Sequence, residues 1–314
     1  MAILKFKNKT IFALEEATYG TNAGVAGANQ IETVNLTINT YAGPTVEKMI
    51  DRETLGAYEQ INTAPQVEIS FDCYLAGAGG SGTDTPPNYK DLLEAAGFDE
   101  TVTASTQVEY APASGSVKSC SIIFEHDGNR HEILGARGNV SFTMNVGELP
   151  RMSFNFIGRY ATPTNATMSS PSKADVGACV PVTNSNTTTF TLGGQTEAMV
   201  GFTMSMNNVI AMENLPNLRE VIYSDRAPSG SVTFLERAIS DYDWYSNAIE
   251  SDSGVTTVVL AVVHGSSPDR VELDAPRLQL SNPQKGERNG NTTMQFDVVA
   301  LPNSGNDEFT LTTL

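Results

Sequence analysis

Alternation of apolar and polar residues is the feature that most restricts how this chain folds. Between Val67 and Leu75 every second side chain is apolar, with Glu68, Ser70 and Asp72 between them. This period of two is that of a β-strand with one buried and one solvated face. The same pattern predicts a mainly β fold, with strands at residues 34–40, 67–75, 117–126, 140–146, 152–156, 202–207, 230–235, 256–263, 270–280 and 292–301.

Only two segments have the period of a helix. In residues 89–97, apolar side chains recur at i, i+3, i+4 and i+7, after a Pro-Pro start and before a terminal glycine. A second helix is expected at residues 239–249, with Ile239, Tyr242 and Ile249 on its inner face.

These elements follow one another in the same order twice. Each series has a strand, a long loop, a strand, a helix and three more strands, and the loops end in Asp51-Arg52 and Asp225-Arg226. Such self-similarity indicates an internal duplication. Exposed ion pairs add little stability, so we expect the two recurring Asp-Arg pairs to contact neighbouring subunits, although a solvated loop end is the alternative.

The duplication divides the chain into two similar β domains, each flanked by one helix. The boundary is expected where the sequence becomes rich in Ser, Thr, Pro and Ala and loses its periodicity. We therefore predict a first domain at residues 1–163, a linker at 164–175 and a second domain at 176–314.

A glycine-rich loop at residues 76–87 contains Gly77-x-Gly79-x-x-Gly82. A dinucleotide-binding loop needs a buried parallel strand before it and a helix that begins at once. Here the preceding strand alternates, six residues separate the last glycine from the helix, and the second half has no such loop. We interpret the segment as a flexible connection and expect no bound cofactor.

The reactive side chains also favour structural roles. His126, Asp127 and His131 offer metal ligands, but the Asp-Gly-Asn turn at 127–129 places both histidines on facing strands of a hairpin. No G-x-S-x-G nucleophile motif occurs, and the three cysteines are too far apart for a C-x-x-C pair. We therefore predict no metal site and no enzymatic activity.

Charge and strand composition disfavour a tight grip on nucleic acid. The chain carries a formal net charge of -17, whereas a protein that grips phosphates needs basic patches. The outward positions of the alternating strands contain no Lys or Arg. These positions are Asn35, Thr37, Asn39, Glu68, Ser70, Asp72, Ser141, Thr143, Asn145, Ser153, Asn155, Thr203, Ser205, Asn207, Gln295 and Asp297.

The edges of such a sheet must be dealt with, because free edges of long strands promote aggregation. A head-to-tail interface whose rotation closes produces a ring without edges. Two similar domains per chain then predict a homotrimeric ring of six similar units, a pseudo-hexamer.

Aromatic residues gather in the second helix, where Tyr242, Trp244 and Tyr245 are close in sequence. We expect Tyr242 to pack inward and Trp244 to cover a neighbouring subunit, because Trp and Tyr are enriched at interfaces. The alternative is that these rings stack on a sugar.

Several motifs in the first half resemble the tail tube, or major tail, proteins of long-tailed bacteriophages. They are the segment 12–21, the Asp-Arg after the long loop, the Gly-rich loop leading to Pro-Pro and Tyr89-x-x-Leu92-Leu93-x-x-x-Gly97-Phe98, Tyr110-x-Pro112, and Asp127-Gly128 followed by the Leu-Gly-Ala-Arg-Gly of residues 134–138. The resemblance covers mainly residues 10–160 and reaches the second half through the duplication.

The resemblance implies a β-sandwich or barrel in each domain, flanked by a helix. Rings of such units stack into a tube whose inner wall is a continuous β-barrel, with the loops at 41–65 and 210–230 reaching the next ring. It also implies tape measure, tail terminator and baseplate or tip proteins as partners. The N-terminal arm with Lys5, Lys7 and Lys9 is expected to lie against an acidic neighbour.

We therefore predict a virion structural protein that self-assembles in the host bacterial cytoplasm into the phage tail tube, a conduit for double-stranded DNA during ejection. A tube wall that lacks Lys and Arg lets phosphates slide past. A basic side chain on the wall would attract phosphates that pass within about 10 Å at 0.1 M salt. No apolar run reaches the roughly 18 residues of a membrane span, and the start of the chain lacks the apolar core of a secretory signal. The alternative is a tandem β-sandwich that binds carbohydrate or a receptor, in a phage appendage or at a cell surface.

Overall fold

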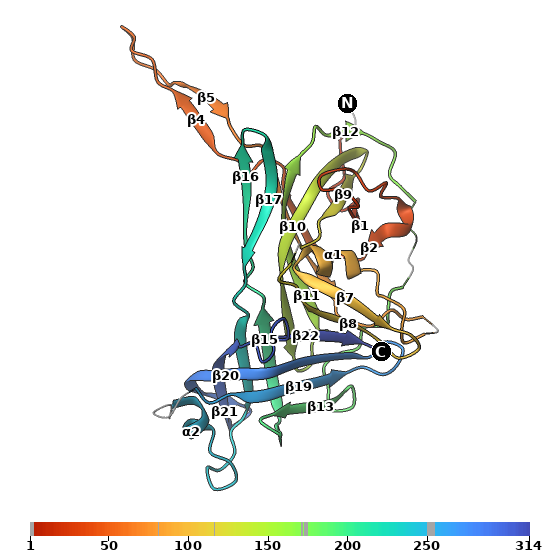
Figure 1. The fold of residues 1–314 in the computed structure, drawn as a ribbon, viewed down its shortest axis with the longest axis vertical. Coiled ribbons are helices and arrows are strands. Elements are labelled where there is room, and N and C mark those ends of the chain that lie inside the picture. Colours follow the sequence, from red (N-terminus) through yellow and green to blue (C-terminus); the bar gives the residue numbers. More distant parts are fainter. Residues whose placement is uncertain (1–2, 81, 116, 171, 173–174, 250–254) are drawn as a thin grey trace.

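A computed structural model describes residues 3–80, 82–115, 117–170, 172, 175–249 and 255–314 of the chain (Figure 1). Antiparallel strands dominate and the two α-helices are short, which confirms the predicted mainly β fold. No helix in these ranges has the length and apolar character that crossing a membrane requires. Below, the first half means residues 1–163 and the second half means residues 176–314.

One antiparallel sheet, which we call the shared sheet, takes four strands from each half. Its order is β3–β6–β11–β10 in the first half and β15–β18–β21–β20 in the second. The bounds are β3 Val34–Asn39, β6 Gln66–Tyr74, β10 Asn129–Asn145, β11 Arg151–Tyr160, β15 Met199–Ser205, β18 Ser229–Leu235, β20 Val271–Arg288 and β21 Asn291–Ala300. The two halves join where β10 pairs with β15, with Ser141 opposite Ser205.

A second layer covers the apolar face of the shared sheet. β9 forms a hairpin with β10, and β19 forms a hairpin with β20. β1 pairs with β9, and β13 pairs with β19. β22 pairs both with β20 and with β8 of the first half, so this layer also connects the halves. The bounds are β1 Lys9–Glu15, β2 Gln30–Ile31, β7 Phe98–Thr103, β8 Gln107–Pro112, β9 Cys120–His126, β12 Thr164–Asn165, β13 Thr187–Leu192, β14 Gln195–Thr196, β19 Val258–His264, β22 Thr310–Thr313 and a 3-10 helix at Gly27–Asn29.

The apolar core is continuous across the junction between the halves. Phe142 of β10 and Phe202 of β15 both pack against Phe309, with ring centroids 5.1 and 6.3 Å apart. All three side chains are inaccessible to solvent, and one buried cluster extends from Ile11 to Leu311. The domain boundaries at 163 and 176 stay a prediction, and residues 171, 173 and 174 of the linker lie outside the described residues.

The helices are shorter than predicted, with α1 at Lys90–Ala95 and α2 at Trp244–Ile249. The expected inner face of α2 is wrong, because Ile239 and Ile249 are 61% and 60% exposed whereas Trp244 is 2% exposed. Asp243 is the reason. Its carboxylate accepts the backbone N–H groups of Tyr245 and Ser246, so the helix begins after Asp243 and turns Trp244 inward.

The two long loops of the sequence fold as β-hairpins (Figure 1). The first consists of β4 (Thr45–Lys48) and β5 (Glu59–Asn62), and the second of β16 (Val209–Leu215) and β17 (Leu218–Asp225). Each hairpin follows the first strand of its half in the shared sheet. In Figure 1 the first hairpin projects from the body of the molecule, whereas the second runs alongside β10.

The glycine-rich loop joins the halves instead of being a free connection. The N–H of Gly77 donates to the carbonyl of Asp269 in the β19–β20 turn, at 3.1 Å. A side chain on Gly79, whose φ is +69°, would collide with the backbone of Val176 and Gly177. Ser81 lies outside the described residues. The glycines therefore permit close backbone approach between the halves.

Candidate assembly surfaces

One face of the shared sheet carries the outward residues of the alternating strands, and we call it the polar face. Residues opposite one another in an antiparallel ladder share a face. One row across four strands consists of Thr37, Ser70, Asn155 and Asn139. Another row, Thr143, Thr203, Ser231, Asp297 and Ser281, crosses from the first half into the second.

The outward residues of the alternating strands, which we expect to line the wall of the tube, lie on or beside this polar face. Their side chains bond to one another across strands. Asn35 donates to Asp72 at 2.8 Å, Thr37 lies 2.7 Å from Ser70, Thr203 lies 3.0 Å from Ser231, and Asn207 donates to Ser229 at 2.7 Å. Hydroxyl and amide groups thus satisfy neighbouring polar atoms, leaving a surface of short side chains. Whether this face lines a channel stays a prediction.

Arginines lie at the ends of the polar face, outside the set of residues predicted for it. Arg151 and Arg159 stand at the two ends of β11, on the same side of the strand as its serine and asparagine. Arg137 on β10 pairs with Glu220 of the second hairpin at 2.7 Å. The alternation in β11 already contained this signal, since both arginines are in phase with the outward residues.

Two edges of the shared sheet are free among the described residues. β3 pairs there with β6 alone, and the segment 279–288 of β20 pairs with β21 alone. In the repeated strand order, β3 is the counterpart of β15 and β20 is the counterpart of β10. The two free edges are therefore counterparts of the two strands that join inside the chain.

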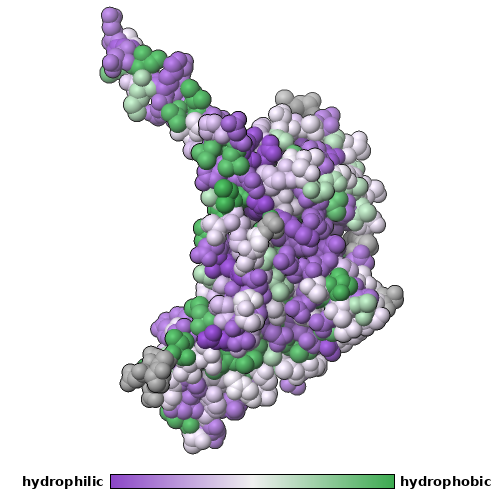
Figure 2. All heavy atoms as spheres, viewed as in Figure 1, coloured by the Kyte–Doolittle hydropathy of each residue, from purple (hydrophilic) through white to green (hydrophobic). Residues whose placement is uncertain are grey.

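The first hairpin exposes an apolar surface. Val46 and Ile61 are cross-strand partners and more than half exposed, and Leu55 near the tip is fully exposed. Every residue of β4 and β5 is exposed. In Figure 2 the projection carries apolar residues interspersed with polar ones. An exposed apolar set on an extended arm is typical of a surface that binds another protein.

The second hairpin is held against the first half. The backbone N–H of Val221 donates to the hydroxyl of Tyr19 at 2.6 Å, and Tyr19 in turn donates to the carbonyl of Gly135. Arg137 contacts both Glu220 and the carbonyl of Val221. Val221 itself is fully buried. This hairpin is therefore part of the body of the molecule.

The two Asp-Arg pairs do not hold equivalent places, contrary to expectation. Asp51 and Arg52 lie between β4 and β5 near the exposed end of the first hairpin, where Arg52 donates to the carbonyl of Ala57. Asp225 and Arg226 lie at the base of the second hairpin, where Asp225 ends β17. The first pair remains available to a neighbouring subunit, and the contact itself stays a prediction.

Arg226 is engaged inside the chain. Its guanidinium pairs with Glu308 at 3.0 Å, with both side chains about one-tenth exposed. It also donates to the carbonyl of Ala113 and to Asn306. Arg226 therefore connects the second hairpin, the first half and the segment before β22, and its proposed role as a contact between neighbours is not supported by this position.

Trp244 also belongs to the chain's own core. Its ring lies 5.2 Å from Phe234 and 4.6 Å from Tyr242, and its Nε1–H donates to Glu197. The expectation that Trp244 covers a neighbouring surface is thus wrong, because Asp243 begins the helix and rotates Trp244 inward. The sequence carried the signal, since Asp is a common N-cap residue.

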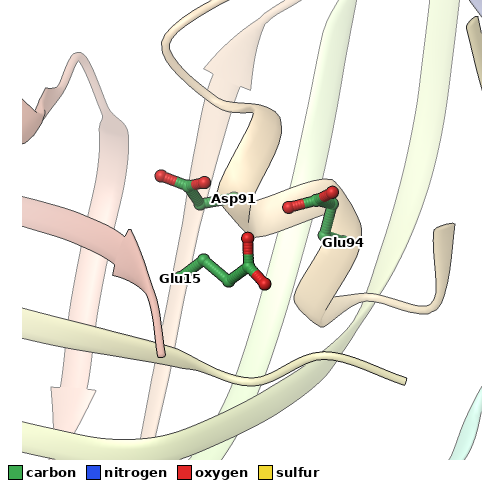
Figure 3. Close-up of side chains that lie close together, drawn as sticks. All are labelled: Glu15, Asp91 and Glu94. Atoms are coloured by element: carbon green, nitrogen blue, oxygen red, sulfur yellow. The ribbon is translucent and has the colours of Figure 1, made fainter. Parts of the chain in front are cut away.

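Three carboxylates meet beside α1, from Glu15, Asp91 and Glu94 (Figure 3). Burial raises the pKa of Asp91 to about 6 and that of Glu94 to about 7, although Lys118 opposes the shift of Glu94. The ammonium of Lys118 lies 2.7 Å from Glu94 and 3.2 Å from Glu15. A side-chain cation therefore already balances this cluster.

The histidines and cysteines have structural surroundings. His126 and His131 lie on β9 and β10 as expected, and neither belongs to a group of potential metal ligands among the described residues. Cys73 and Cys120 are buried free thiols, and burial raises the pKa of both well above that of a free cysteine. Low thiolate content makes such residues unreactive.

Comparison with protein families gives a match to a model described as "Phage tail tube protein", which covers residues 7–300. The match spans both halves and nearly every element described above. A search of curated proteins finds no match to the chain.

Proposed function

The chain belongs to the phage tail tube protein family, and we propose that it assembles into closed rings that stack to form a conduit for double-stranded DNA. Family membership gives a structural role in the virion tail. The repeated strand order and the two free edges support the ring. A structural family also favours a non-enzymatic protein.

The observation that carries the proposal is the relation between the junction inside the chain and the free edges. β10 ends the four-stranded unit of the first half and pairs with β15, which begins the next unit. Among the described residues, β20 ends the second unit and pairs along 279–288 with β21 alone, while β3 begins the first unit and pairs with β6 alone. Pairing β20 of one chain with β3 of the next repeats the internal junction.

Such a head-to-tail contact is heterologous, and it closes into a ring when the rotation per unit divides a full turn. Two units per chain then give six similar units from three chains, which is the predicted homotrimer. Closure also removes both free edges, which otherwise template aggregation. The polar face is continuous across β10 and β15, so repeating this junction extends it around one side of the ring.

The composition of the polar face supports passage of DNA. Its central rows hold Ser, Thr, Asn and Asp, and the arginines of β11 stand at its ends. Neutral and acidic side chains release no counter-ions from the phosphates, so a sliding duplex gains little from contact. We assign this face to the lumen, including Asn39, Glu68 and Asn145 near its margins.

Stacking is assigned to the first hairpin, whose apolar residues need a partner surface. Other tail components, namely tape measure, terminator and baseplate or tip proteins, would meet the same tube, which is built in the host cytoplasm. The carbohydrate-binding alternative loses its main support, because Trp244 is buried and Tyr242 packs against it.

Electron microscopy of the purified protein over a concentration series tests the proposal. We expect rings at low concentration and hollow rods at high concentration, with threefold symmetry in averaged end views. A monomer at all concentrations, or a ring of six whole chains, would contradict the proposed assembly.

A further inference from the structure

We propose that Glu287 of one chain forms an ion pair with Lys9 of the next chain, beside a β20–β3 junction whose register copies that of β10–β15. This inference rests on the proposed ring. It concerns which residues meet where two chains join, and so it goes beyond the existence of a ring.

A shared irregularity aligns the two halves residue by residue. In the first half, one extra residue follows Ile133 before Ala136 pairs with Cys120. In the second half, one extra residue follows Ala275 before Leu278 pairs with Val258. Bulges of this kind fix the register of a strand. Leu278 of β20 is therefore the counterpart of Ala136 of β10.

The alignment continues along the outer part of both strands. Ser141 of β10 stands opposite Ser153 of β11. After a second bulge, Gln284 of β20 stands opposite Gln295 of β21 at the equivalent place. Gln284 is thus the counterpart of Ser141, and Glu287 is the counterpart of Met144.

The same comparison aligns β3 with β15. Thr37 stands opposite Ser70 of β6, and Thr203 stands opposite Ser231 of β18. Thr37 is therefore the counterpart of Thr203, and Leu36 the counterpart of the preceding residue, Phe202.

The internal junction now gives the register between chains. Ser141 pairs with Ser205, and Met144 pairs with Phe202. Copied onto the free edges, Gln284 of one chain meets Asn39 of the next, and Glu287 meets Leu36.

Lys9 lies where Glu287 arrives. Its ammonium donates to the backbone carbonyl of Leu36 at 2.5 Å and lies 4.4 Å from the ring centre of Phe6. Glu287 is out of phase with Gln284, so its side chain points away from the polar face, toward the layer that contains β1. A carboxylate and an ammonium are thereby brought to the same side of the junction.

The internal junction provides a check on this placement. Lys9 stands opposite His126, and Thr187 stands opposite His264, so Thr187 is the counterpart of Lys9. Thr187 lines the same depression as Val146, two residues along the chain from Met144. The counterpart of Lys9 therefore lies at the same end of the internal junction as Met144, the counterpart of Glu287.

The two kinds of junction differ chemically. Inside the chain, Phe142 and Met144 are fully buried against the second half. Between chains the corresponding positions are Lys285, which pairs with Glu236 at 2.8 Å, and Glu287, which is exposed. An apolar junction resists salt, whereas a charged junction is weakened by screening. Chains should therefore associate reversibly, while the halves of one chain stay together.

Charge reversal tests the ion pair, with assembly measured by sedimentation velocity at low ionic strength. We expect Glu287→Lys and Lys9→Glu each to weaken ring formation by about tenfold or more, and the double variant to recover to within about threefold of the wild type. Asp241→Lys is the matched control, since Asp241 is exposed on a turn and undergoes the same charge change. Normal assembly of both single variants, or failure of the double variant to recover although it folds, would overturn the ion pair.

Cysteine pairing tests the register in a Cys179→Ser background. Ser141→Cys with Ser205→Cys should form a disulfide within one chain, because these residues form a pair without backbone hydrogen bonds, with Cα atoms about 4.5 Å apart. Gln284→Cys with Asn39→Cys should instead link different chains into covalent dimers and trimers. If rings form but the second pair does not cross-link, the register is wrong while the proposed function stands. If the wild type forms no rings at all, the proposed function itself fails.

Discussion

The two long hairpins follow equivalent strands, β3 and β15, but they have different surroundings. β4 and β5 are exposed throughout, whereas β17 buries Val221 against the first half. The difference comes from the partners: Tyr19 and Arg137 bind the second hairpin, and β4 and β5 have no such partners among the described residues. The two halves therefore share a strand order in the shared sheet, but of their two described hairpins only the first is a free arm. The proposed ring of three chains would therefore have three arms instead of six.

Removing the free arm should have the largest effect on assembly and the smallest on folding. The N–H of Thr63 donates to the carbonyl of Pro44 at 3.1 Å, so the ends of the hairpin can be joined by two glycines. We expect this deletion to abolish tubes while rings persist, with a melting temperature within about 2 °C of the wild type. Electron microscopy and calorimetry measure the two effects.

The matched deletion removes residues 210–222 of the second hairpin. Because this hairpin buries Val221 and supplies partners to Tyr19 and Arg137, its loss should lower the melting temperature markedly or prevent folding. Equal effects of the two deletions on the melting temperature would break the comparison between the hairpins.

Replacement of the two arginines gives a smaller, purely thermodynamic contrast. Arg226→Ala leaves Glu308 buried without its partner and should lower the free energy of unfolding by about 3 kcal/mol. Arg52→Ala removes an exposed side chain and should change it by less than about 0.5 kcal/mol. Urea denaturation measures both. A large effect of Arg52→Ala in the isolated chain would show that the first hairpin is not free.

A last contrast, seen only when the pH is changed, concerns the buried carboxylates that α1 has and α2 lacks. The pKa of Glu94 is raised to about 7 in the folded chain, so protonation favours folding, and this contribution is lost as pH rises from about 4.5 through 7. Glu94→Gln cannot ionise. Its stability relative to the wild type should rise by up to about 3 kcal/mol between pH 4 and pH 8, as measured by denaturation at several pH values. A difference independent of pH would contradict the raised pKa.

Period-two alternation made the strands and the polar face predictable from sequence. In β6 and β11 the side that faces the core is read directly from every second residue, because a strand has only two faces. The repeated order of elements likewise anticipated the recurring strand order of the shared sheet.

The packing of the hairpins was not predictable in this way. The bond between Val221 and Tyr19 joins residues far apart in sequence, and nothing local to either reveals it. Trp244 is a different case. The helix was expected to begin at Ile239, but it begins at Trp244, after the Asp243 cap. Because residues 239–243 are not helical, Ile239 does not define the inner face, and Trp244 was placed on the wrong side.

The pairing of β22 with β8 affects how the chain is made. β8 is synthesised early, but β22, which covers its edge, follows all the other strands described above. A growing chain on the ribosome therefore carries an uncovered strand edge for most of its translation, when edge-to-edge association with other nascent chains is a hazard. Folding of the first half is completed only when Leu311 becomes available, and such long-range pairing is slow. Chaperone protection during synthesis is of most value to this part of the molecule.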